Sequence, residues 1–161
     1  MIDAELLGEA AALLDAARAR GVALATAESL TGGLIAATLT AIAGSSDVVD
    51  RGFVTYSNAA KQELLGVPAE LIRQHGAVSE PVARAMAAGA LARSRAGIAV
   101  AVTGVAGPGG GTAEKPVGLV WFGLAQRGQP VASESRVFAG NRTAIRAATV
   151  AQAIALIRAR L

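Results

Sequence analysis

The sequence predicts a three-layer α/β/α sandwich around a mixed, mostly parallel sheet of about five strands. Residues 98–102 form a continuous apolar run of strand length, which is typical of a strand that helices cover on both faces. Helix-like segments alternate with strand-like runs along most of the chain, as expected when helices connect parallel strands. Two later strand-like runs are separated by Arg127-Gly-Gln-Pro130, a hairpin signal that adds one antiparallel strand.

The N-terminal segments predict a helix, a strand and a second helix. Residues 3–20 place apolar side chains at i, i+3, i+4 and i+7, the stripe of an amphipathic helix, and Gly21 supplies a stop. Residues 22–25 form a short apolar run with strand character. Residues 34–42 continue as an apolar helix that ends near Gly44.

The middle of the chain predicts a second strand and three helices. Residues 50–56 are rich in β-branched and aromatic side chains, and Ser57-Asn58 follows as a helix-capping pair. Helices are expected at residues 59–65 and 69–74, separated by a glycine and a proline that interrupt the pattern. An alanine-rich helix is expected at residues 82–95, after a serine cap and a proline.

The C-terminal part adds a loop, the hairpin and a last helix to the buried strand. Residues 105–116 are a glycine-rich stretch, which is either a mobile connector or, more often in a compact domain, a lid or binding loop. The hairpin strands are expected at residues 117–126 and 131–139. A helix with an apolar stripe is expected at residues 144–161.

Length and composition favour one domain that spans residues 1–161. Hydrophobic residues make up 53% of the chain, but the excess is mostly alanine, and no apolar run is long enough to span a bilayer. The acidic N-terminus lacks the basic flank and apolar core of a secretory signal. We therefore expect a cytoplasmic protein that does not bind membranes. Its alanine-rich helix faces suit a homo-oligomer, with a dimer as the expected form, but such faces also pack within a single domain.

Charge and residue usage exclude several classes of function. The isoelectric point is about 10.2, yet the net charge is only +3 and the arginines are spread through helices, so specific nucleic-acid binding is not expected. The chain has no cysteine, which excludes disulfides, thiolate metal sites and a cysteine nucleophile. The chain has only one histidine, His75, and this scarcity disfavours a Ser-His triad and a zinc site. No metal and no cofactor are expected.

The stretch Thr26-Ala-Glu-Ser-Leu-Thr-Gly-Gly33 is the leading candidate for a functional site. It lies between an expected strand and an expected helix, where free backbone N–H groups can face a ligand. Ser29 carries the reactive side chain, and Gly32 and Gly33 allow another molecule to approach the backbone closely. From local sequence alone, a helix cap at Ser29 or Thr31 explains the pattern as well as a nucleophile does.

Two basic residues occupy helix positions that oppose the helix dipole. Lys61 lies in the first turn of an expected helix, and Arg142 lies where the last helix opens. Lys61 is therefore either a functional group or a solvated surface lysine, which is the commoner case. Arg142 at a helix N-terminus suits a phosphate or carboxylate ligand better than it suits the dipole.

Five segments form one pattern along nearly the whole chain: Ala27-Glu-Ser-Leu-Thr-Gly-Gly33, Val54-Thr-Tyr-Ser-Asn58 with Lys61, Ala77-Val-Ser-Glu80, Val102–Gly111 with Glu114–Gly118, and Gly140-Asn-Arg142. In this order they resemble the CinA C-terminal domain family, the nicotinamide-nucleotide amidohydrolases, also called NMN deamidases. Each segment alone is a weak signal, whereas five in order are specific.

The resemblance implies hydrolysis of the carboxamide of nicotinamide mononucleotide (NMN), which gives nicotinic acid mononucleotide and ammonia in pyridine-nucleotide salvage. It also implies a mixed-sheet α/β/α fold and no metal. In larger family members a molybdopterin-binding-like domain precedes this one, so the chain resembles the stand-alone form. One common variant of the family has Cys at the position of Leu30, and this chain has no thiol to act as the nucleophile.

Similarity to the family points to Ser29 as the nucleophile and Lys61 as its base, a Ser-Lys variant of the triad. Burial and a helix N-terminus both disfavour a charged lysine and so favour the neutral form that a base requires. Tyr56 is expected to orient the lysine or relay a proton. Glu28 is expected either to hold Lys61 or a substrate hydroxyl, or to serve as a structural hydrogen-bond acceptor.

The resemblance also implies residues that bind the substrate. Arg142 is expected to bind the 5′-phosphate, and the glycine loop with Gly107 is expected to close over the ribose. Thr103 and Gly104, at the end of the third expected strand, are expected to contact the substrate. Backbone N–H groups are expected at the oxyanion, from Leu30, Thr31, Gly32 and Gly33.

The alternative is a nucleotide-binding or regulatory module, associated with competence or DNA damage, that has kept the fold and lost turnover. The presence of the serine, the lysine, Tyr56 and Arg142 argues against that loss. A third class, direct DNA binding, is favoured only by the isoelectric point.

Overall fold

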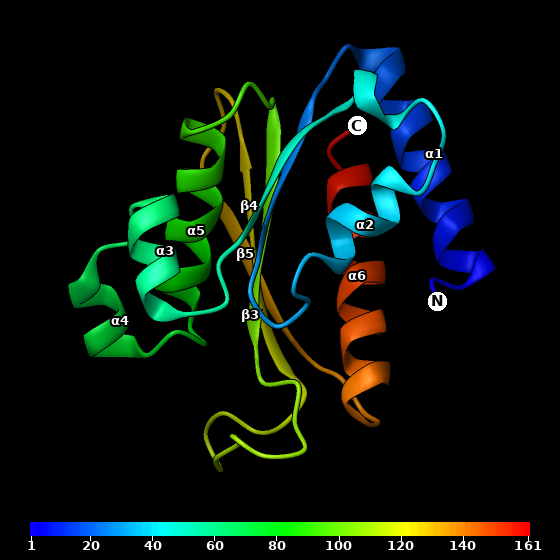
Figure 1. The fold of residues 1–161 in the computed structure, drawn as a ribbon. Coiled ribbons are helices and arrows are strands. Elements are labelled where there is room, and N and C mark those ends of the chain that lie inside the picture. Colours follow the sequence, from blue (N-terminus) through cyan, green and yellow to red (C-terminus); the bar gives the residue numbers. More distant parts are fainter.

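The structure is a computed structural model that describes all 161 residues, and its five strands form one sheet (Figure 1). In the order β2-β1-β3-β4-β5, β1 (Leu24–Glu28) pairs in parallel with β2 (Val49–Val54) and β3 (Ile98–Gly104). β4 (Leu119–Gln126) is antiparallel to β3 and to β5 (Ala132–Val137). Only β4 therefore runs against the other strands, which confirms the predicted mixed and mostly parallel sheet.

Helices cover both faces of this sheet (Figure 1). One face carries α1 (Ala4–Arg20), α2 (Leu34–Thr40) and α6 (Arg142–Arg158), and the opposite face carries α3 (Asn58–Leu65), α4 (Ala69–His75) and α5 (Glu80–Ala92). A short 3-10 helix, η1 (Ser45–Asp47), leads into β2. None of the helices combines the length and the apolar character needed to cross a bilayer. The layers confirm the predicted α/β/α sandwich.

Two hydrophobic clusters fill the spaces between the layers. Val100 and Val102 of β3 belong to a cluster of 22 buried residues on the side of α1 and α6. Ala99 and Ala101 alternate with them and belong to a cluster of 12 buried residues on the side of α5. Because β3 is buried on both faces, its sequence is a continuous apolar run rather than an alternating one.

Small residues allow α5 to pack closely against its neighbours. A side-chain Cβ at Gly123 of β4 would overlap the carbonyl oxygen of Ala83 in α5. A Cβ at Gly89 of α5 would overlap the carbonyl oxygen of Leu65, the last residue of α3. Close backbone approach therefore requires glycine at these two positions. Through these contacts α5 holds α3 near the carboxyl ends of the parallel strands.

The strand boundaries differ from the predicted ones where they matter for function. β1 was expected at residues 22–25 but runs from Leu24 to Glu28, because Thr26 to Glu28 pair with strands on both sides. β3 likewise continues through Thr103 and Gly104, which pair with β4. β2 ends at Val54, so Tyr56 lies beyond the strand and not at its edge. These ladders depend on distant segments, which a local apolar pattern does not reveal.

Candidate active site

Ser29 is the first residue after β1, and the sheet holds its backbone. The Ser29 N–H donates to the carbonyl oxygen of Val102 in β3 at 3.1 Å. Ala25 and Ala27 of β1 pack on the side of α5, and strand alternation directs the next odd-numbered residue to the same side. Ser29 therefore faces the layer that contains α3.

Lys61 of α3 reaches Ser29 from that layer. Its Nζ lies 3.0 Å from Ser29 Oγ, 2.8 Å from the carbonyl oxygen of Thr55 and 3.3 Å from that of Tyr56. Lys61 is only 1% exposed, so the alternative of a solvated surface lysine does not hold. No carboxylate forms an ion pair with it. The three contacts match the three N–H groups of an ammonium ion.

The start of α3 explains how the lysine is aimed. Ser57 caps the helix by accepting a hydrogen bond from the Ala60 N–H at 3.0 Å. Side chains in a helix tilt toward its N-terminus, so Lys61 in the first turn points back at the segment that precedes the helix. Leu65, one turn later on the same face, is buried against α5 and fixes the rotation of the helix.

Burial lowers the pKa of Lys61 from its ordinary value of 10.5 to about 8. The ammonium loses hydration in this position, and no nearby carboxylate compensates for the loss. At pH 7 roughly a tenth of the molecules therefore carry a neutral Lys61 amine. In that form two N–H groups serve the two backbone carbonyls, and the lone pair is left facing the Ser29 hydroxyl.

Tyr56 contributes its two ends to different partners. Its backbone carbonyl accepts from Lys61, whereas its side chain turns toward α6, and the residue as a whole is 60% exposed. The phenol oxygen accepts a hydrogen bond from the Arg142 guanidinium at 3.1 Å. The structure thus brings Tyr56 to the lysine through the backbone, and the phenol makes no hydrogen bond to Lys61 or Ser29.

Arg142, the first residue of α6, joins three separate segments. Besides Tyr56 it contacts the glycine-rich loop, where it donates to the carbonyl oxygen of Gly107 at 2.8 Å. Asn141 caps α6 by accepting from the Ala144 N–H, which places Arg142 at the exposed N-terminal end of the helix. The arginine, the loop and the segment after β2 therefore meet at one edge of the sheet.

Glu28 is a structural acceptor in this structure. Its buried carboxylate accepts from the Thr31 hydroxyl at 2.6 Å, from the Ile35 N–H at 2.8 Å and from the Ala36 N–H at 3.0 Å. It forms no hydrogen bond with Lys61. The residue at the N-cap of α2 is Gly33, which has no side chain to cap with, so Glu28 serves the N-terminus of that helix from inside the sheet.

The Glu28 contacts also settle the local ambiguity in the motif. Neither Ser29 nor Thr31 occupies the N-cap position of α2, and the Thr31 hydroxyl donates to Glu28 instead. Gly32 and Gly33 both have positive φ, 57° and 102°, which the turn between β1 and α2 requires. Ser29 therefore does not cap the helix, and the hydrogen-bond partner of its hydroxyl is Lys61.

Thr103 and Gly104 belong to β3 rather than to a loop. The buried Thr103 hydroxyl donates to the carbonyl oxygen of Ala77 at 2.9 Å, which fastens the segment before α5 to the sheet. Gly104 pairs with Val120 of β4. Both follow Val102, the residue that holds the Ser29 backbone, but neither makes a hydrogen bond to Ser29 or Lys61.

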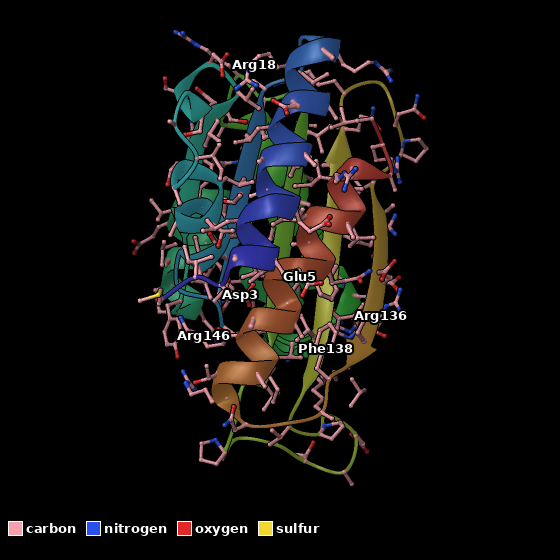
Figure 2. All side chains as sticks on the ribbon, turned by 90° about the vertical axis from the view of Figure 1, so that its right-hand side faces the viewer. Asp3, Glu5, Arg18, Arg136, Phe138 and Arg146 are labelled. Atoms are coloured by element: carbon pink, nitrogen blue, oxygen red, sulfur yellow. The ribbon has the colours of Figure 1, made fainter.

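Arg146, which the sequence analysis did not single out, contacts the turn that follows Ser29. Figure 2 shows it on the N-terminal part of α6, on the side of the helix away from Arg136 and Phe138. Its Nε donates to the carbonyl oxygen of Leu30 at 3.1 Å, and a terminal nitrogen donates to that of Thr31 at 3.0 Å. The only available signal was its position one helical turn after Arg142.

No three His, Asp or Glu side chains gather in positions that could hold a metal ion. The groups that the structure does bring together are a hydroxyl, a buried amine, an exposed guanidinium and the backbone of a turn. These are the parts needed for attack of a serine on a carbonyl carbon, with a lysine to take the proton.

Comparison with known proteins gives a consistent result. The model of the CinA C-terminal domain family matches residues 8–161. Nicotinamide-nucleotide amidohydrolase PncC of Escherichia coli strain K12 is 50% identical over 155 residues, which cover 96% of this chain and 93% of that protein. A CinA-like protein of Mycolicibacterium gilvum is 54% identical over 157 residues, which cover 96% of this chain but only 37% of that longer protein.

A solved structure agrees with the fold. The crystal structure of a competence/damage inducible protein from Agrobacterium tumefaciens matches with a TM-score of 0.95 at 51% sequence identity. The match covers 99% of this chain and 97% of that one. Because both chains are covered almost completely, the shared arrangement includes the segments that carry Ser29, Lys61 and Arg142.

The contacts of Glu28 predict a stability defect for Glu28→Gln. The amide has only one acceptor oxygen and would turn N–H groups toward donors, so we expect the free energy of unfolding to fall by about 1–3 kcal/mol. Urea denaturation followed by circular dichroism measures the change. Glu63→Gln, at an exposed position of α3, is the matched control and should leave stability unchanged. Equal stability of both variants would contradict the capping role.

Proposed function

Because the chain belongs to the CinA C-terminal domain family, we propose that it hydrolyses the carboxamide of NMN to nicotinic acid mononucleotide and ammonia, in pyridine-nucleotide salvage. A relative of similar length and 50% identity is named a nicotinamide-nucleotide amidohydrolase. The observation that carries the proposal is the buried Lys61 Nζ, 3.0 Å from Ser29 Oγ and without a carboxylate partner. That pair supplies the nucleophile and the base that amide hydrolysis needs.

The reaction begins with proton transfer within this pair. The neutral Lys61 amine accepts the Ser29 hydroxyl proton while Oγ attacks the carboxamide carbon and forms a tetrahedral intermediate. The carbonyl oxygen gains the negative charge, and free N–H groups of the turn after Ser29 stabilise it. The backbone carbonyls of Thr55 and Tyr56 keep the resulting ammonium in place.

The same lysine completes both halves of the reaction. The Lys61 ammonium donates its proton to the amide nitrogen, the C–N bond breaks, and ammonia leaves an ester on Ser29. Lys61 is neutral again and accepts a proton from water, which attacks the ester carbon. Collapse of the second intermediate returns the proton to Ser29 Oγ and releases the nicotinate carboxyl group, so atoms and charges balance.

The 5′-phosphate is assigned to Arg142. This guanidinium is exposed at the N-terminal end of α6, and its present acceptors are two neutral oxygens, on Tyr56 and Gly107. A phosphate is a stronger acceptor for the guanidinium than either of them, and the helix N-terminus adds to the attraction. Arg142 also donates to the Gly107 carbonyl in the glycine-rich loop. Phosphate binding at Arg142 would therefore affect the position of the loop that is expected to close over the ribose.

A binding module without turnover is the weaker alternative. Burying an amine without a carboxylate partner costs folding free energy. Nucleotide binding alone does not require such a buried amine. A hydrolase needs such a desolvated amine as its base. The single domain over residues 1–161, the homodimer and the cytoplasmic location stay predictions from the sequence.

Ser29→Ala is expected to reduce ammonia release from NMN by about a thousandfold or more, because the nucleophile is absent. The hydroxyl contacts only Lys61, so the variant should keep its circular dichroism spectrum and thermal midpoint. Ser135→Ala on β5 is a matched control at an exposed serine and should retain full activity. Turnover retained in a folded Ser29→Ala protein would exclude the covalent mechanism.

The lowered pKa of Lys61 predicts the pH dependence of activity. Since the neutral amine is the active form, kcat/KM for NMN should rise about tenfold per pH unit up to the pKa near 8 and then level off. Steady-state kinetics in overlapping buffers measures the profile. A flat profile through that region would exclude Lys61 as the base.

A measurement without substrate checks the same pKa. Folding lowers the pKa of Lys61 from 10.5 to about 8, so between these values the unfolded chain binds more protons than the folded protein. The free energy of unfolding should therefore gain a contribution that increases with pH across this window. Lys61→Met removes that contribution. Urea denaturation that gives parallel pH curves for both proteins would contradict the lowered pKa.

Arg142→Ala is expected to raise KM for NMN by about 10–100-fold, because a charge-assisted contact to the phosphate is lost. The variant should also lose any preference for NMN over nicotinamide riboside, which has no phosphate. Arg136→Ala, at an exposed arginine of β5, is the matched control. An unchanged preference in folded Arg142→Ala would remove this residue from the phosphate site.

A further inference from the structure

We propose that Arg146 is a positioning residue that fixes the peptide between Leu30 and Thr31, so that the Thr31 N–H becomes a donor to the oxyanion. This inference rests on the proposed function, which places amide hydrolysis at Ser29. It adds a residue outside the motif that carries the nucleophile. Arg146 touches neither Ser29 nor Lys61 and acts through the backbone that follows the serine.

Arg146 holds two consecutive carbonyl groups with one side chain. Its Nε donates to Leu30 at 3.1 Å and a terminal nitrogen donates to Thr31 at 3.0 Å. The planar guanidinium sets the separation of its two donors, so the pair of contacts fixes the direction of both carbonyls. The arginine projects from α6, a helix of 17 residues, which gives the turn a rigid support.

Peptide geometry converts the carbonyl directions into N–H directions. In a trans peptide the C=O and the following N–H point in opposite directions, and this peptide is trans. The Leu30 carbonyl points toward α6, so the Thr31 N–H points away from α6. The far side of the turn is the side of α3, from which Lys61 reaches Ser29 (Figure 1).

The next peptide supports this direction. The Thr31 carbonyl also points to Arg146, and the Gly32 N–H on the opposite end donates back to the carbonyl oxygen of Ser29 at 3.0 Å. The Gly32 N–H, whose own peptide carbonyl is held by Arg146, is therefore turned toward the backbone of Ser29.

The Thr31 N–H has no hydrogen-bond acceptor within the protein, and because Thr31 is fully buried it is an unpaired buried donor. Among the N–H groups of residues 30–33, only that of Gly32 has a backbone acceptor. Thr31 is only two residues after Ser29 along the chain. A cation on the Leu30 carbonyl polarises that amide and makes the Thr31 N–H a stronger donor.

Glu28, an acidic hydrogen-bond acceptor, holds the same turn that Arg146, a basic donor, contacts. Glu28 accepts from the Thr31 hydroxyl and from the first N–H groups of α2, whereas Arg146 donates to carbonyl oxygens. Glu28 and Arg146 form no ion pair with each other. Each is therefore committed to the backbone or side chains of the turn, which leaves its free amides preorganised.

The first test compares Arg146→Gln and Arg146→Lys with the same changes at Arg158. Arg158 lies on the same helix, pairs with Glu9 on the surface, and is the matched control. We expect kcat for NMN to fall about 100-fold in Arg146→Gln and about 10-fold in Arg146→Lys, which keeps the charge but not the fork. KM should stay within about threefold of the wild-type value. The midpoint of the pH profile should stay within about half a pH unit of the wild-type midpoint.

A second measurement does not depend on NMN. Acetylation of Ser29 by p-nitrophenyl acetate passes through the same kind of oxyanion, and release of p-nitrophenolate together with mass spectrometry reports its rate. This rate should fall in the Arg146 variants in parallel with kcat. If wild type leaves NMN unchanged but the acetylation rate still depends on Arg146, the positioning role stands and the NMN assignment fails.

Chemical rescue separates positioning from packing. A cavity of about 230 Å³, lined in part by Leu34, Thr38 and Arg146, opens beside the side chain, so a small cation can reach its place. Added guanidinium, kept below denaturing concentration, should restore part of kcat in Arg146→Ala and none in Ser29→Ala.

Three results would overturn the role of Arg146. The first is a folded Arg146→Lys or Arg146→Gln protein with wild-type kcat and wild-type Ser29 acetylation. The second is a loss of activity that appears only as a raised KM or a shifted pH midpoint. The third is a wild-type Ser29 that reacts with neither NMN nor p-nitrophenyl acetate, which would overturn the proposed function as well. Circular dichroism and thermal melting establish that each variant is folded.

Discussion

The site depends on the burial of one amine that has no ionic partner. Lys61 is fully enclosed, and its contacts are two backbone carbonyls and the Ser29 hydroxyl. A permanent charge there would be costly, so the fold favours the neutral form and keeps the lone pair beside the serine. The close packing of α5 on α3 at Gly89 holds the lysine in this position. Core packing and chemical reactivity are thus coupled through a single helix.

The nucleophile gains its surroundings from three separate parts of the sheet and helices. β3 holds the Ser29 backbone, Glu28 of β1 holds the start of α2, and Arg146 of α6 holds the intervening carbonyls. Polar groups of both signs are used, and each is satisfied by backbone or hydroxyl partners. The turn is therefore specified by the layers around it more than by its own glycines.

Local patterns in the sequence were sufficient for the fold, whereas the Ser29–Lys61 pair was expected only from the resemblance to the family. Helix ends agree with the expected ones within three residues, because apolar periodicity, glycine stops and serine caps act locally. The length of β1, the role of Arg146 and the choice between the two roles expected of Glu28 could not be predicted in this way. The length of β1 and the role of Arg146 depend on partners far along the chain, such as Leu30 for Arg146, and a single sequence gives no record of those contacts. The partners of Glu28 lie only three to eight residues away, but both of its expected roles fit the local sequence.

The reversed direction of β4 affects where the sequence can vary during evolution without disturbing the sheet. Because β3 and β4 are antiparallel neighbours, their connection must emerge at the same end of the sheet as Ser29, and the glycine-rich segment does so. Its tip projects beyond the sheet, where insertions disturb no ladder (Figure 1). Ligand preference can therefore diverge by altering this one connection, while the serine and its lysine keep their places on β1 and α3.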